Sequence, residues 1–168
     1  VYQALTFIAE LAKKEGFEVD KCDGYCTEIK LGNGPKLISL YAHSDVVPVS
    51  GDWKYPPFSA TIEDGVMYGR GTSDDKGPAM AAFYDLKYLK ENSDLGDYQV
   101  RLVIGGNEEK GSKCLEYYFH HLHKPNPNYG FTPDGDFPLI YGEKGISNYE
   151  SVVNVNLKPL LEFNAGVV

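Results

Sequence analysis

Four short groups of residues carry the side chains that could do chemistry in this chain. Each contains one or two carboxylates, and the first also contains a histidine. Imidazole and carboxylate groups together are ligands that zinc, manganese and cobalt accept in proteins. In chain order the groups are His43-Ser44-Asp45, Ser73-Asp74-Asp75, Asn107-Glu108-Glu109 and Pro133-Asp134-Gly135. Each alone fits a polar turn or a helix cap, so only their combination indicates a metal site.

Two of these groups have features that favour a site over a turn. His43 follows an apolar strand and precedes Asp45 by two residues, so Asp45 could orient the imidazole, as carboxylates often do for metal-binding histidines. Glu108 and Glu109 follow a strongly apolar run, where adjacent carboxylates are unfavourable unless they are protonated or paired with cations. Alternation along a strand would send these two side chains in different directions.

The elements that must position these groups are helices and strands in alternation. Helical periodicity is expected over residues 1–15, 77–91 and 112–122, with Gly16 ending the first helix and Ser112 capping the third. Strands are expected over residues 25–31, 36–42, 98–104 and 147–157.

Two turn signals refine this pattern. Gly32-Asn33-Gly34 indicates a hairpin between the first two strands, and a second, short hairpin is expected over residues 59–68. Residues 124–128 are expected to be a loop. The whole pattern predicts an α/β fold with a mixed, largely parallel central sheet flanked by helices. Sheets of this kind bind ligands at the carboxyl ends of their strands, which is where the candidate groups lie.

The composition fits one globular domain and disfavours several classes of partner. The chain has 168 residues, 42% of them hydrophobic, and a formal net charge of −8. This acidic balance argues against nucleic acid and anionic membranes, and no run approaches the roughly 18 apolar residues of a membrane span. Cys22, Cys26 and Cys114 lack metal-type spacing and are expected to be reduced thiols of a cytoplasmic protein. The acidic balance says nothing positive about the substrate, and the sequence does not indicate an oligomeric state.

In this order, the four groups resemble the M20 metallopeptidases, a family that includes carnosinase-like and PepV-like dipeptidases. The resemblance runs from about His43 to Gly145. It rests on the segments His43-Ser-Asp-Val-Val-Pro, Tyr68-Gly-Arg-Gly-Thr-Ser-Asp-Asp-Lys-Gly, Asn107-Glu-Glu and Thr132-Pro-Asp, and Trp53 to Ser59 is similar to the family's Trp…Pro-Phe stretch. It implies a zinc-peptidase-like catalytic domain.

The resemblance also implies a cofactor and a role for each site residue. Two divalent metal ions are expected, zinc first, with manganese or cobalt as alternatives. They would be held by His43 and Asp134 on one side and by Glu109 on the other, with Asp74 bridging them. Asp45 would orient His43. Glu108 would be the general base that activates a water molecule between the two metals, and the Asp74–Asp75 peptide bond would be cis.

The substrate class follows from the same resemblance. The segment Thr132-Pro-Asp-Gly-Asp-Phe-Pro is most similar to the dipeptidase branch, so short peptides with a free N-terminus, including β-alanyl dipeptides, are the expected substrates. One alternative is a deacylase of the acetylornithine or succinyl-diaminopimelate type. Another is a non-catalytic homologue that keeps the fold for binding or assembly.

One expected ligand is not matched. The family places a further histidine on the second metal, whereas His120, His121 and His123 lie on or near one predicted helix and are expected to be exposed. We therefore expect an incomplete catalytic domain over residues 1–145, with most of the lid domain absent. Residues 146–168 would be the start of the lid or dimerisation domain. The parent enzyme would be active and this piece of it nearly inert.

Overall fold

The computed structural model describes residues 1–135, 139–142 and 145 of the chain. Nearly all of the described residues belong to one unit, Val1–Asp136, and the residues from Phe137 onward form another. The strand predicted at residues 147–157 and the lid segment predicted at residues 146–168 lie outside the described residues.

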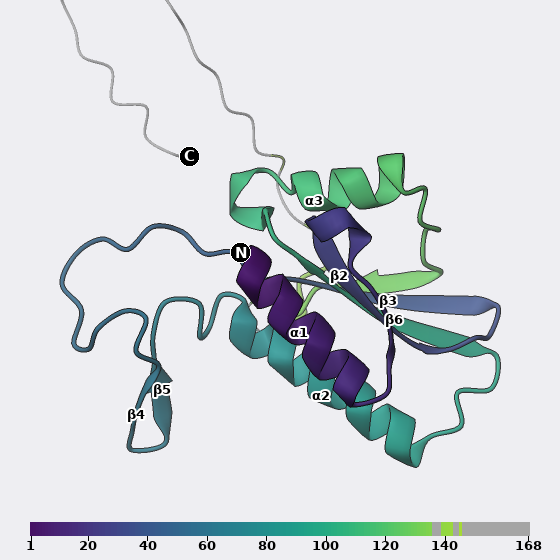
Figure 1. The fold of residues 1–168 in the computed structure, drawn as a ribbon, viewed down its shortest axis with the longest axis horizontal. Coiled ribbons are helices and arrows are strands. Elements are labelled where there is room, and N and C mark those ends of the chain that lie inside the picture. The colour runs from purple at the N-terminus through teal and green to yellow at the C-terminus, as the bar shows by residue number, and fades with distance from the viewer. Residues whose placement is uncertain (136–138, 143–144, 146–168) are drawn as a thin grey trace, which may run out of the picture. The chain divides into compact units, whose positions relative to one another are not determined.

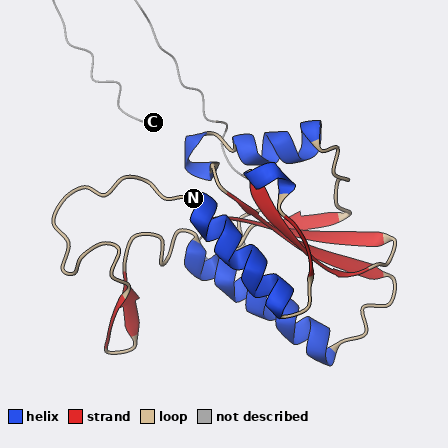
Figure 2. Cartoon of the chain, in the orientation of Figure 1, coloured by secondary structure: helices blue, strands red, loops and turns tan. Residues whose placement is uncertain are grey.

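The framework of the first unit is a five-stranded mixed sheet (Figure 2). Its strands, in the order β1-β2-β6-β3-β7, are Glu18–Asp20, Cys26–Gly32, Tyr98–Gly105, Lys36–His43 and Tyr129–Phe131. The central strand β6 is antiparallel to β2 and parallel to β3, while β1 is antiparallel to β2 and β7 is parallel to β3. The predicted mixed sheet is therefore confirmed, with two parallel and two antiparallel pairings among these strands.

Helices cover both faces of this sheet, as predicted (Figure 1). On one face lie α1 (Tyr2–Lys14) and α2 (Lys76–Asn92), and they enclose the main core with β6 side chains such as Leu102 and Ile104. On the other face, α3 (Lys113–Glu116) continues into a π-helix, η3 (Tyr117–His121), which packs Tyr118 against Val103. Two 3₁₀ turns, η1 (Cys22–Gly24) and η2 (Glu108–Lys110), precede β2 and follow β6.

The hairpin predicted between β2 and β3 is wrong, because β6 lies between these strands and pairs with both of them. Strand β6 is buried on both faces, so its backbone groups need ladder partners on both edges. The turn Gly32-Asn33-Gly34 instead contacts the start of β6, where the Gly34 N–H donates to the carbonyl of Tyr98 at 3.3 Å. A Cβ at Gly34 would lie 2.1 Å from the carbonyl carbon of Asp97, so this approach requires glycine.

Several other local predictions have clear outcomes. Gly16, with φ at +74°, ends α1, and the short hairpin is present as a separate sheet of β4 (Thr61–Glu63) and β5 (Val66–Tyr68). Ser112 is the N-cap residue of α3, as predicted, but it adopts φ of 52° and its side chain makes no capping hydrogen bond. None of the helices in the described part of the chain has the length and apolar character that a membrane crossing requires.

Candidate metal centre

Three parallel strands deliver three of the four groups to one edge of the sheet. His43 is the last residue of β3 and is paired in register with Gly105, the last residue of β6. Glu108 and Glu109 follow β6 closely, and Asp134 follows β7. The fourth group, Asp74 and Asp75, differs from the prediction, because it follows no strand of this sheet and lies in the turn that begins α2.

The His43 imidazole lies at the centre of the cluster. Its side chain is 2% exposed, and its Nε2 atom lies 3.0 Å from Asp74 Oδ1, 3.2 Å from Asp134 Oδ2 and 3.8 Å from Glu108 Oε2. Despite these neighbours, Nε2 makes no hydrogen bond to any described residue. A buried ring nitrogen without a hydrogen-bond partner, facing several carboxylate oxygens, fits coordination of a cation.

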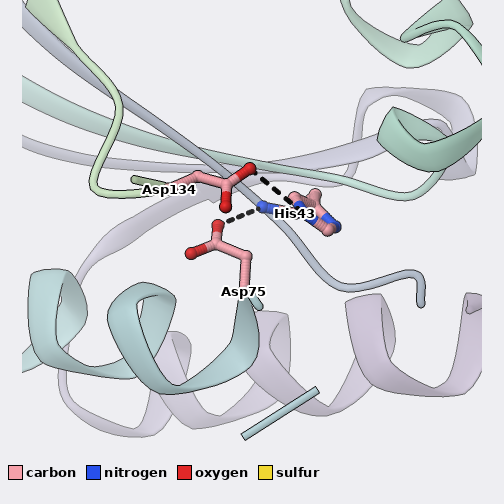
Figure 3. Close-up of side chains that lie close together, drawn as sticks. All are labelled: His43, Asp75 and Asp134. Carbon is pink, nitrogen blue, oxygen red and sulfur yellow. Dashed lines mark hydrogen bonds and ion pairs between the residues drawn. The ribbon is translucent and has the colours of Figure 1, made fainter. Parts of the chain in front are cut away.

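His43 and the surrounding acids form two groups with the spacing of a metal site. His43 lies with Asp75 and Asp134 in the first group, shown in Figure 3, and with Asp74 and Glu109 in the second. Within each group the potential ligand atoms lie within 4.8 Å of one another. One imidazole with four carboxylates is a donor set suited to zinc, manganese or cobalt, so these residues fit the predicted metals. Neither group includes His120, His121 or His123.

Asp45 links the histidine to the two glutamates. Its carboxylate oxygens accept the backbone N–H groups of Glu108 and Glu109, each at 3.1 Å. Its backbone carbonyl oxygen lies 3.1 Å from His43 Nδ1, and its carboxylate Oδ1 lies 3.4 Å from the same atom. Asp45 thus faces the imidazole, as the sequence predicts, but mainly through its carbonyl, while its side chain fixes the turn that carries the glutamates.

The two glutamates diverge for a different reason from the one the sequence suggested. They lie in the 3₁₀ turn η2, where strand alternation does not apply. Glu109 Oε1 accepts the N–H of Val47 at 3.1 Å, whereas the Glu108 side chain is 46% exposed beside His43. Burial raises the pKa of Glu108, and the carboxylates of Asp134 and Glu109 raise it further against the opposing effect of His43. A carboxylate with a raised pKa that solvent can reach is suited to proton transfer.

Charge around the histidine favours a bound cation. Burial lowers the pKa of His43, but the carboxylates of Asp134, Asp75 and Asp45 outweigh burial and raise it above its ordinary value. Without metal, the imidazolium can therefore act as the counter-ion for these acids. A metal ligand must be deprotonated, so metal affinity should increase with pH as this proton is lost.

Asp75 is a site residue that the sequence reasoning missed. Its side chain is fully buried, and its Oδ2 accepts the His43 backbone N–H at 2.9 Å (Figure 3). Its Oδ1 has no hydrogen-bond partner among the described residues. The adjacent acids were visible in the sequence, but the resemblance gives a role only to Asp74. The peptide bond between them is cis, as the resemblance implies.

Comparison with known proteins decides the family. The sequence model of peptidase family M20/M25/M40 matches residues 39–164. This chain belongs to that family. The matched range includes all four groups of candidate site residues.

Two curated relatives of this M20 chain carry dipeptidase names. A Bacillus subtilis protein named "Putative dipeptidase YtjP" is 46% identical over 146 residues, which cover 87% of this chain and 31% of that protein. The "Beta-Ala-Xaa dipeptidase" of Lactobacillus delbrueckii subsp. lactis is 37% identical over 169 residues, which cover 98% of this chain and 36% of that protein. The chain thus spans about a third of the length of these relatives.

A solved structure confirms the M20 fold. The M20 family metallo-carboxypeptidase Sso-CP2 from Sulfolobus solfataricus superimposes with a TM-score of 0.68 at 30% sequence identity. The match covers 80% of this chain and 32% of that structure. The predicted fold class of a zinc-peptidase-like catalytic domain is therefore confirmed.

The buried carboxylate of Asp75 gives this M20 chain a testable pH dependence. Burial raises the pKa of Asp75 to about 6, and the carboxylates of Asp134 and Asp74 add to it. The folded protein then binds this proton more tightly than the unfolded chain does, so stability falls as pH rises from about 4 to 6. In EDTA at pH 7, Asp75→Asn should raise the free energy of unfolding by up to about 3 kcal/mol.

Urea unfolding in EDTA at pH 4 and pH 7 measures this effect. The increase in the free energy of unfolding of Asp75→Asn should be present at pH 7. It should be small at pH 4, where the wild-type carboxyl is already protonated in the folded protein. Asp85→Asn, at an exposed position of α2, is the matched control and should change little at either pH. An Asp75→Asn protein that is less stable than wild type at pH 7 would contradict the assignment.

Proposed function

We propose that the enzyme containing this chain hydrolyses dipeptides with two divalent metal ions, zinc being the first candidate. The observation that carries the proposal is the gathering of His43 with the acids Asp74, Asp75, Glu109 and Asp134 at one sheet edge. The Glu108 side chain lies beside this cluster and is exposed enough to meet a substrate. Membership of a peptidase family supports peptide-bond hydrolysis as the reaction class.

Each site residue expected from the sequence has a proposed part in this reaction. His43 and Asp134 would hold one ion and Glu109 the other, with Asp74 reaching both. Bound divalent ions supply Lewis-acid polarisation of the scissile carbonyl and increase the acidity of water. Glu108 accepts a proton from the attacking water and returns it to the departing amine. Asp45 keeps the imidazole and the Glu108 backbone in place through the contacts described above.

The proposed substrate class is narrower than the reaction class. The names of the two relatives refer to dipeptides, and one refers to dipeptides that begin with β-alanine. The segment that contains Thr132 and Asp134 is also most similar to the dipeptidase branch. We therefore propose dipeptides with a free N-terminus, including β-alanyl dipeptides, as substrates.

A substrate panel tests the proposal on the full gene product that contains this sequence. The protein is loaded with zinc, manganese or cobalt and assayed against Ala-Ala, Gly-Leu and β-Ala-His. N-acetylornithine and N-succinyl-diaminopimelate are included in the same panel. Cleavage of the free dipeptides alone supports the proposal, whereas cleavage of the N-acylated compounds alone would support a deacylase instead. Absence of turnover on every compound with every metal would favour a non-catalytic homologue.

The arrangement of the chain and its location are also proposals. We propose that residues 1–145 are part of the catalytic domain and that residues 146–168 begin the lid domain. The 168-residue chain alone should turn over dipeptides poorly, because neither metal-ligand group among the described residues contains a second histidine. The cysteines Cys22, Cys26 and Cys114 are buried and unpaired, which fits the proposed cytoplasmic location.

A further inference from the structure

A buried polar cluster lies on the sheet face that α3 and η3 cover, and the metal centre does not use it. Arginine and glutamate are rarely buried fully unless they are paired, so their presence here requires an explanation. Arg101 is 1% exposed, while Glu28 and Tyr118 are 0% exposed. The cluster consists of Glu28, Ser39, Tyr41, Arg101, Tyr118 and Lys124.

Arg101 is the member that joins the most elements. It comes from the middle of β6, and its Nε donates to Ser39 Oγ of β3 at 2.6 Å. Its Nη2 donates to the backbone carbonyl of Pro125 at 2.7 Å and to the Tyr41 hydroxyl at 3.3 Å. Its Nη1 lies 3.8 Å from Glu28 Oε2, so the guanidinium connects three strands of the sheet with the loop after η3.

Two other members of the cluster, Lys124 and Tyr118, also bond to Glu28. Lys124 Nζ donates to Glu28 Oε1 at 3.0 Å and to Asp20 Oδ2 at 2.6 Å, and the Tyr118 hydroxyl also bonds to Glu28. The Tyr118 ring lies 5.2 Å from the guanidinium carbon of Arg101. The carboxylate therefore remains paired even where Arg101 is changed. Arg101 alone in the cluster bonds to Ser39, Tyr41 and Pro125, and of these only Pro125 lies outside the sheet.

The contact with Pro125 attaches the interior of the loop of residues 124–128, whose first residue is held separately by the hydrogen bonds of Lys124 to Asp20 and Glu28. Residues 124–128 contain Pro125 and Pro127, which have no backbone N–H with which to form a ladder. The backbone carbonyl of Pro125 accepts its hydrogen bond from the Arg101 side chain and not from a neighbouring strand. At the far end of the loop, Asn128 is fixed to Leu37 by two hydrogen bonds, each of 2.8 Å. Hydrogen bonds therefore attach both ends of the loop to the sheet.

The loop leads directly to the strand that carries Asp134 toward His43. All three residues of β7 are exposed, with Tyr129 65% and Phe131 52% exposed, so apolar packing does little to hold this strand. Its position at the sheet edge depends on the ladder with β3 and on the loop before it. Asp134 follows shortly afterwards, and its Oδ2 lies 3.2 Å from His43 Nε2.

We propose that Arg101 is a positioning residue for the metal centre, which acts by fixing the loop before β7 through the Pro125 carbonyl so that Asp134 reaches His43. The inference rests on the proposed function in that it treats Asp134 as a metal ligand. The guanidinium touches neither metal ligands nor substrate, and its effect reaches the site only through the backbone of residues 125–134.

The test compares Arg101→Met with Tyr118→Phe in the full gene product. Tyr118→Phe disturbs the same buried cluster but leaves the Arg101–Pro125 hydrogen bond in place. Arg101→Met should weaken zinc binding by about tenfold, measured by competition with a chromophoric chelator, and Tyr118→Phe should leave it unchanged. In EDTA, amide hydrogen exchange of residues 129–135 should be faster in Arg101→Met alone.

A double-mutant cycle with Asp134→Ala identifies the route of the effect. If Arg101 acts through Asp134, Arg101→Met should cause no further loss of zinc affinity in the Asp134→Ala protein. An equal loss in both backgrounds, or wild-type zinc affinity and exchange in Arg101→Met, overturns the inference. If Arg101→Met does not fold, the charge-neutral pair Glu28→Gln with Arg101→Met replaces it. Failure of both to fold would show a general stability role and would also overturn the inference.

The proposed function can fail separately. A wild-type protein that binds zinc but hydrolyses no dipeptide would contradict the proposed reaction while the zinc and exchange comparisons remain valid. A wild-type protein that binds no zinc would contradict the metal site itself, and with it the part given to Asp134.

Discussion

Replacement of Glu108 by glutamine is expected to slow dipeptide hydrolysis by about 100- to 10,000-fold at saturating substrate and to leave the zinc content unchanged. The Glu108 carboxylate is partly exposed and lies 3.8 Å from His43 Nε2, so it reaches the centre without belonging to either group of candidate ligands. Glutamine keeps the size and the backbone hydrogen bond to Asp45, but its amide cannot accept the proton of the attacking water. The loss should therefore appear in kcat.

Steady-state kinetics of the full gene product, with zinc measured by mass spectrometry, separates chemistry from binding. Glu116→Gln, at an exposed position of α3, is the matched control and should retain wild-type kinetics. If Glu108→Gln loses its zinc, Glu108 is a ligand and the base must be sought elsewhere. If it keeps both zinc and activity, the proposed general base is wrong.

The sequence indicated where the candidate centre lies because three of its four groups follow strands of one sheet. Once β3 and β6 are recognised as parallel neighbours, His43 and the glutamates must meet at one edge, whatever the exact bounds of the strands. Asp134 joins them because it follows β7. The hydrophobic pattern of the sequence did not indicate this strand, because its three residues are all exposed and show no alternation between buried and exposed positions. The position of Asp134 was therefore expected from the resemblance and not from the local pattern.

The errors have a common physical origin in long-range pairing. Gly32-Asn33-Gly34 is a strong local hairpin signal, but β6 needs ladder partners on both edges and displaces β3 from β2. Arg101 lies in the same apolar strand, and its burial depends on partners in the sheet and in the loop after η3, which are distant in sequence. A charged residue inside an otherwise apolar central strand is the signal that could have identified that cluster.

Asp75 is the residue of the site whose position the local sequence could not predict. Adjacent aspartates in a turn give no indication of which side chain points inward. In the fold, Asp75 is fully buried against the His43 backbone, while the Asp74 side chain is 58% exposed. The difference in exposure between the two side chains is set by the contact between the start of α2 and the end of β3, two segments that are distant in sequence.

Removal of the His43 imidazole is expected to weaken zinc binding more than about 100-fold and to abolish hydrolysis. His43 is the residue that the two candidate groups of ligands have in common, so its loss affects both. Its Nε2 atom also lies 3.0 Å from Asp74 Oδ1 and 3.2 Å from Asp134 Oδ2. Equilibrium dialysis of His43→Ala against increasing zinc concentrations measures the loss of zinc affinity.

The matched control is His120→Ala, which removes an exposed imidazole from η3. It should bind zinc as the wild type does, since no candidate group of ligands in the described residues contains it. Because His43 is buried, circular dichroism and thermal unfolding in EDTA must show that His43→Ala is folded, and His43→Gln provides a variant of closer size. Folded His43 variants with wild-type zinc affinity would mean that the carboxylates alone hold the metal, and the proposed ligand set would be wrong. A loss in His120→Ala instead would assign the second-metal histidine to η3.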